Sequence, residues 1–115
     1  FEPTILTNIT KDMKVWKEEL FGPILPIISF RTIEEAIELA NDTIYGLGSY
    51  LFTTNKENFE KVSREIKTGM VSCNNLTYVI PEDPFGGVKM SGIGRNHSKF
   101  GFQELCNIKI ITFEK

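Results

Sequence analysis

The chain has 115 residues, of which 41% are hydrophobic and 24% are charged, and its formal net charge is −2. This composition is typical of one globular domain, or of one piece of a larger domain, and it argues against disorder of the whole chain. The weakly acidic balance gives no electrostatic reason to expect nucleic acid or an anionic membrane as a partner.

The longest apolar stretch, at residues 24–30, is interrupted by Pro26 and Ser29 and is too short to span a membrane. The first residues, 1–4, contain neither an initiator Met nor the features of a signal peptide, so we expect the chain to be cut from something longer. Only two cysteines are present, Cys73 and Cys106. Their scarcity favours a reducing compartment, the cytoplasm, and two free thiols.

The first half of the chain alternates an apolar run with an amphipathic one. Residues 24–30 are rich in Ile and Leu, which predicts a buried strand. Thr32 to Glu35 then spells a capping box, in which the hydroxyl and the carboxylate satisfy free amides at the start of a helix. Four apolar residues share one face of this helix, which we expect to end near residues 41–42: Ile33, Ala36, Ile37 and Ala40.

The pattern then repeats. Residues 48–53 predict a second strand, and a second capping-box spelling at residues 54–57 precedes a helix with Val62 in its apolar stripe. We expect Gly69 to be the left-handed residue that ends this helix. Residues 70–73 predict a third strand.

Strands that alternate with helices predict parallel neighbours and crossover helices. The fold class is therefore α/β, with a three-layer, open and mainly parallel sheet. Ligands bind to such sheets beyond the carboxyl ends of the strands, here near residues 31, 54 and 74. The following loop, residues 74–94, is long and rich in Gly and Pro, which favours a functional role. A short helix over about 95–105 and a last strand over 108–113 complete the prediction.

Residues 17–23 contain the most specific motif, a carboxylate followed by an aromatic ring and a Gly-Pro turn. The carboxylate of Glu19 can accept the two hydroxyl protons of a vicinal diol, and the ring of Phe21 offers a flat apolar face to the same ligand. From the residues alone, a solvated acidic pair before a turn is the simpler interpretation.

Five segments, taken together, resemble the aldehyde dehydrogenase superfamily in order and spacing. They are spread over essentially the whole chain: residues 1–5, 19–23, 40–49, 68–74 and 84–95. The resemblance implies the fold of that family's catalytic domain over residues 1–106 and an oligomerisation strand over residues 107–115. It also implies NAD or NADP as the cofactor and oxidation of an aldehyde to a carboxylic acid.

Residue roles follow from the matched positions. Glu19 corresponds to the carboxylate that binds the nicotinamide ribose, and Phe21 and Leu47 correspond to residues beside the nicotinamide. Phe85 matches an apolar residue near the aldehyde, and Val79 takes a substrate-facing position that is commonly aromatic. The resemblance implies that Glu19 and Phe21 face one cleft together with the loop of Phe85.

The matched segment implies no catalytic residue in this chain. In the family, a cysteine thiolate attacks the aldehyde and a glutamate helps water to hydrolyse the thioester, and both lie upstream of this segment. Cys73 is expected to be a small hydrophobe of its strand. Cys73, His97 and Cys106 lack the spacing of metal ligands. The isolated segment should therefore be inactive and should need the upstream part of the same enzyme.

Several alternatives stay open. Asn74 is more often structural than ligand-binding, and His97 favours a surface or helix-capping role over catalysis. Lys89 and Arg95 could meet an anion, although solvated charges are the default. Residues 108–113 would pair across a homo-oligomer interface or form an ordinary internal strand. The whole chain could also be a free-standing or split-subunit α/β interaction module without catalysis.

Overall fold

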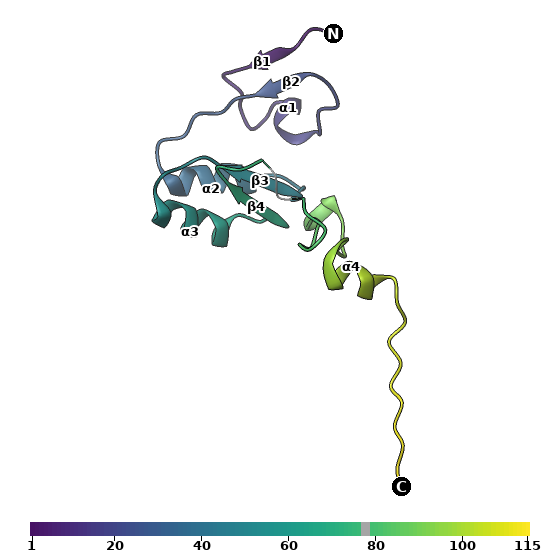
Figure 1. Cartoon of the computed structure of the whole chain (residues 1–115). Coiled ribbons are helices and arrows are strands. Elements are labelled where there is room, and N and C mark those ends of the chain that lie inside the picture. The colour runs from purple at the N-terminus through teal and green to yellow at the C-terminus, as the bar shows by residue number, and fades with distance from the viewer. Residues whose placement is uncertain (77–78) are drawn as a thin grey trace. The chain divides into compact units, whose positions relative to one another are not determined.

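The computed structural model describes residues 1–76 and 79–115. Thr77 and Tyr78, which belong to the predicted loop over 74–94, lie outside the described residues. The chain divides into two compact units, residues 1–44 and residues 45–115. Figure 1 shows the order of the helices and strands along the chain.

The first unit contains two parallel strands and two helices: β1 (Thr4–Leu6), α1 (Lys14–Lys17), β2 (Ile24–Pro26) and α2 (Ile33–Asn41). Thr4 pairs with Ile24 and Leu6 pairs with Pro26. The sequence prediction missed β1 and α1, because three or four residues are too few to show a period. β2 is shorter than the predicted strand over 24–30.

The second unit repeats the arrangement with longer elements: β3 (Gly48–Leu51), α3 (Lys56–Glu65), β4 (Met70–Cys73), the 3-10 turn η1 (Lys89–Ser91) and α4 (Ser98–Glu104). β3 and β4 are parallel neighbours, with Gly48 opposite Met70 and Leu51 opposite Cys73, and α3 is the crossover helix between them. These parallel strand–helix–strand units confirm the predicted α/β class. The strands form one two-stranded sheet in each unit.

Side chains cap both of the longer helices. The Thr32 hydroxyl accepts a hydrogen bond from the Glu35 amide at 3.2 Å, as the capping-box spelling predicted for α2. The cap of α3 is Asn55, whose carboxamide oxygen accepts from the Asn58 amide at 3.0 Å. The second spelling therefore places the cap one residue early, at Thr54, because an Asn directly after it is at least as good an N-cap.

The prediction for Gly69 is wrong. Helix α3 ends at Glu65, and its C-cap residue, Ile66, has an extended backbone. The helix is therefore finished before Gly69, which is not among the left-handed residues of the described chain. A different requirement for glycine at this position appears in the packing of the second unit.

Only a few side chains form a core. Ile37 of α2 and Val62 of α3, both on predicted apolar faces, are the most buried hydrophobic residues, each 7% exposed. Residues 107–115 contain neither helix nor strand, and Ile108, Ile110, Ile111 and Phe113 are more than 80% exposed. The predicted last strand is thus not formed within this chain, because a strand needs a hydrogen-bonded neighbour. Its pairing with a second copy stays a prediction.

Within the described ranges, no helix combines the length and the apolar character needed to cross a membrane.

Candidate functional site

Two of the predicted ligand-facing residues, Leu47 and Phe85, line one pocket of the second unit. The pocket has a volume of about 160 Å³. Leu47 immediately precedes β3, and Phe85 lies in the loop that follows β4. The remaining lining comes from the glycine-rich loop: Gly86, Gly87 and residues 91–96. The fold therefore brings together two residues that are 38 positions apart.

The loop that carries Phe85 is closed by backbone hydrogen bonds. The Phe85 amide donates to the Asn96 carbonyl at 2.8 Å, and the Asn96 amide donates back to the Phe85 carbonyl at 2.7 Å. Arg95 adds a side-chain restraint, because its Nη1 donates to the carbonyls of Gly87 at 2.8 Å and Gly94 at 2.6 Å. The default expectation of a solvated Arg95 is therefore wrong, since its guanidinium donates to the loop itself.

Gly46 fastens this loop to the sheet. Its carbonyl accepts from the amides of Val88 at 2.9 Å and Gly69 at 3.1 Å, and its own amide donates to the Ser91 hydroxyl at 2.9 Å. Gly69 in turn lies so close to the loop that a Cβ atom would collide with the Gly86 carbonyl oxygen. Main chain thus passes directly against main chain, which only glycine allows. This packing holds the Leu47 position and the Phe85 loop together.

Asn74 has a structural role at the carboxyl ends of β3 and β4. Its Oδ1 accepts from the Thr53 amide at 3.0 Å, and its Nδ2 donates to the Thr53 carbonyl at 2.6 Å. Its backbone φ is 52°, a left-handed value that Asn tolerates better than most residues. The carboxamide therefore ties the two segments that leave the sheet, which favours the structural interpretation.

The other predicted residues of this unit lie outside the pocket. Val79 is 50% exposed and is not part of the pocket lining. His97 occupies the N-cap position of α4 but makes no side-chain capping bond, and its exposed ring lies 5.8 Å from the Phe85 ring. Cys73 is half-buried in β4 and Cys106 is exposed, and both are free thiols.

In the first unit, Glu19 and Phe21 lie on the loop 18–23, which we call the α1–β2 loop. The loop is held at both ends, because the Glu18 amide donates to the Lys14 carbonyl and the Thr4 amide donates to the Pro23 carbonyl, each at 2.8 Å. Between these points, Glu19 is exposed and Phe21 is 93% exposed.

An open carboxylate beside an open ring has the chemistry to hold a ribose diol and a nicotinamide. Glu19 and Phe21 belong to one unit, whereas Leu47 and Phe85 belong to the other. The cleft shared by all four stays a prediction.

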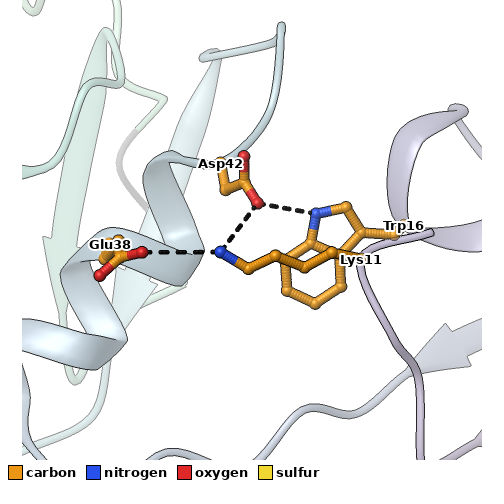
Figure 2. A network of polar contacts seen from close by, with 4 residues as sticks. All are labelled: Lys11, Trp16, Glu38 and Asp42. Carbon is orange, nitrogen blue, oxygen red and sulfur yellow. Dashed lines mark hydrogen bonds and ion pairs between the residues drawn. The ribbon is translucent and has the colours of Figure 1, made fainter.

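Sequence reasoning missed a polar network beside the α1–β2 loop, shown in Figure 2. Asp42 Oδ2 accepts from the Trp16 indole nitrogen at 3.0 Å and lies 3.4 Å from the Lys11 ammonium. The same ammonium lies 3.5 Å from Glu38 and 5.9 Å from the centre of the Trp16 ring. The sole tryptophan, three residues before Glu19, was the available signal, but its partner is 26 residues away.

Comparisons with known proteins identify the family of the chain. The model of the aldehyde dehydrogenase family matches residues 1–111. A probable betaine aldehyde dehydrogenase of Schizosaccharomyces pombe is 48% identical over 110 residues, which are 96% of this chain and 22% of that protein. A succinate-semialdehyde dehydrogenase [NADP(+)] of Mycobacterium ulcerans is 43% identical over 111 residues, 96% of this chain and 24% of that protein.

Solved structures show the same likeness. An NAD-dependent aldehyde dehydrogenase of Sinorhizobium meliloti superposes with a TM-score of 0.86 and 39% identity, over 90% of this chain and 21% of that chain. A betaine aldehyde dehydrogenase of Staphylococcus aureus in complex with NAD+ gives the same TM-score at 41% identity and the same coverage. The chain thus spans less than a quarter of the length of these relatives. With its family model, its curated relatives and its fold in agreement, this chain belongs to the aldehyde dehydrogenase family.

Proposed function

We propose that this chain is the C-terminal part of the catalytic domain of an NAD(P)-dependent aldehyde dehydrogenase. The pocket that joins Leu47 to Phe85 carries the proposal, because a nicotinamide-side residue and an aldehyde-side residue must lie close together for hydride to pass between the two molecules. When bound, the nicotinamide coenzyme supplies the hydride acceptor. The chain's own residues bind and orient the reactants.

Three residues are proposed to hold the coenzyme. The exposed carboxylate of Glu19 accepts hydrogen bonds from the two ribose hydroxyls, and such bonds to a charged acceptor are stronger than neutral ones. The open ring of Phe21 and the side chain of Leu47 provide apolar surface for the nicotinamide. Phe85 is proposed to face the aldehyde from this pocket. Val79 does not line the pocket, and its proposed place beside the aldehyde rests on the family resemblance, in which a small side chain leaves more room than an aromatic one.

The covalent chemistry is proposed to come from elsewhere in the parent enzyme. Cys73 is half-buried as the last residue of β4, where it pairs with Leu51 of β3, and a thiol in a strand packs as a small hydrophobe. Cys106 follows α4 and does not line the pocket. We therefore expect this chain alone to be inactive.

Three further properties of the parent are proposals. The relatives include proteins named for NAD and for NADP, so either coenzyme is compatible with this segment. The exposed apolar tail, residues 108–113, would pair with a second copy of the chain, since an unpaired apolar segment is otherwise an aggregation hazard. The two free thiols favour the cytoplasm as the compartment.

The test uses the complete enzyme that contains this chain. We expect Glu19→Gln to slow single-turnover hydride transfer roughly tenfold or more, because a charge-assisted bond is worth about 1.5–3 kcal/mol. The adjacent Glu18→Gln, which changes the same charge in the same loop, is the matched control and should leave the rate unchanged. Equal rates of hydride transfer for the two variants would contradict the assignment of Glu19 to the coenzyme site. NADH production by the isolated chain would refute its expected inactivity.

A further inference from the structure

We propose that the indole of Trp16 and the carboxylate of Asp42 act as positioning residues for the α1–β2 loop, and so for the Glu19 carboxylate. The inference rests on the proposed function and adds two residues to which that function assigns no contact with the coenzyme. It starts from the network in Figure 2, where the Trp16 indole and the Asp42 carboxylate point toward each other.

The hydrogen bond joins α1 to the end of α2, the two helices that precede and follow β2 in sequence. Trp16 belongs to α1, which immediately precedes the α1–β2 loop, and Asp42 is the C-cap residue of α2. Because α1 is only four residues long, it has little stability of its own. An anchor to α2 therefore restrains α1 and the residues that follow it.

The Trp16–Asp42 hydrogen bond lies close to Glu19 in sequence. Glu19 lies three positions after Trp16, and the backbone bond from the Glu18 amide to the Lys14 carbonyl closes the helix between them. The far end of the loop is held independently, where Pro23 accepts from Thr4 of β1. Loss of the indole bond would thus loosen α1 together with the start of the loop, while the end at Pro23 stays in place.

The ion pairs of Lys11 are weaker candidates for the same role. The side chains of Lys11 and Glu38 are 55% and 75% exposed, and exposed pairs contribute little because water and salt screen them. The indole bond is also exposed, and the Asp42 side chain is 45% exposed, but the indole nitrogen is a single fixed donor on a rigid ring and its acceptor is a carboxylate oxygen. The orientation of the loop should therefore depend more on the indole bond than on the ion pairs.

The experiment compares variants of the complete enzyme by coenzyme dissociation constant, kcat, KM and Tm. Trp16→Phe keeps an aromatic ring and removes the donor, and Asp42→Ala removes the acceptor. Each should weaken coenzyme binding about fivefold to tenfold and raise the KM for coenzyme more than it lowers kcat. The double variant should be no weaker than the single ones, because both remove one interaction. Asp42→Asn, which keeps an acceptor oxygen, should restore part of the affinity.

Glu38→Gln is the matched control, because it neutralises a carboxylate of the same helix without touching the indole bond. Its coenzyme affinity should stay within about twofold of the parent. Glu19→Gln tests the proposed function separately from the positioning role of Trp16 and Asp42. If Glu19→Gln weakens coenzyme binding and Trp16→Phe and Asp42→Ala do not, the positioning inference is overturned and the proposed function stands. If Glu19→Gln has no effect either, the proposed function fails.

A purely structural role gives a different result. Trp16→Phe would then lower Tm and kcat together and leave the coenzyme dissociation constant of the folded enzyme unchanged, which also overturns the inference.

Discussion

The two loops that carry the proposed ligand-facing residues are held by different physical means. In the second unit, the Phe85 loop is fastened by main chain against main chain, through Gly46, Gly69 and Gly86. In the first unit, the α1–β2 loop has backbone bonds at its two ends, and its additional anchor is the partly exposed side-chain bond between Trp16 and Asp42. The main-chain packing of the Phe85 loop leaves no room for added atoms. The α1–β2 loop has room for added atoms, but its anchor depends on single polar groups.

The largest expected effect comes from adding one methyl group to the second unit. Gly69→Ala should destabilise the enzyme by about 3 kcal/mol, because the new Cβ collides with a backbone oxygen that cannot rotate away. Gly22→Ala, in the α1–β2 loop, is the matched control, since a Cβ there meets nothing within 4 Å. It should change the free energy of unfolding by less than about 0.5 kcal/mol. Chemical denaturation measures the free energy of unfolding of both variants. Equal losses of stability would show that the two loops tolerate added atoms equally.

A smaller effect is expected at Arg95. Arg95→Leu removes two charge-assisted bonds to the carbonyls of Gly87 and Gly94 and should destabilise the Phe85 loop by about 2 kcal/mol. Amide hydrogen exchange should show faster exchange at the Phe85 and Asn96 amides, which are bonded across the loop. Lys99→Leu, an exposed cation nearby in sequence, serves as the control. Unchanged exchange in Arg95→Leu would show that backbone packing alone closes the loop.

The smallest effect belongs to the side-chain contacts of the first unit. The Thr10 hydroxyl donates to Asp12 at 2.5 Å, and this bond, with a backbone bond, lowers the pKa of Asp12 below its ordinary value of 3.8. Since the folded-state pKa is lowered, the contribution to stability is present above pH 3.8 and is lost as the pH falls through the folded-state pKa. Thr10→Val should raise the pKa of Asp12 in an NMR titration. An unchanged midpoint would assign the shift to the backbone bond.

The helices and strands with a clear period could be predicted from the order of the residues. The strand over 70–73 and the helix after Thr32 were predicted with their observed starts, because burial on one face selects apolar residues at regular spacing. Family membership was equally accessible, since the motifs stand in order along the chain. The short β1 and α1 were missed because three or four residues carry no period.

Contacts between groups far apart in the sequence became evident only from the folded chain. It placed Leu47 and Phe85 in one pocket, paired Asn74 with the Thr53 backbone and joined Trp16 to Asp42. It also showed that Gly69 is required by a close approach to Gly86 rather than by a helix end. The physical reason is that local sequence encodes propensity and burial, whereas a contact between residues far apart depends on where the intervening strands and helices carry the chain.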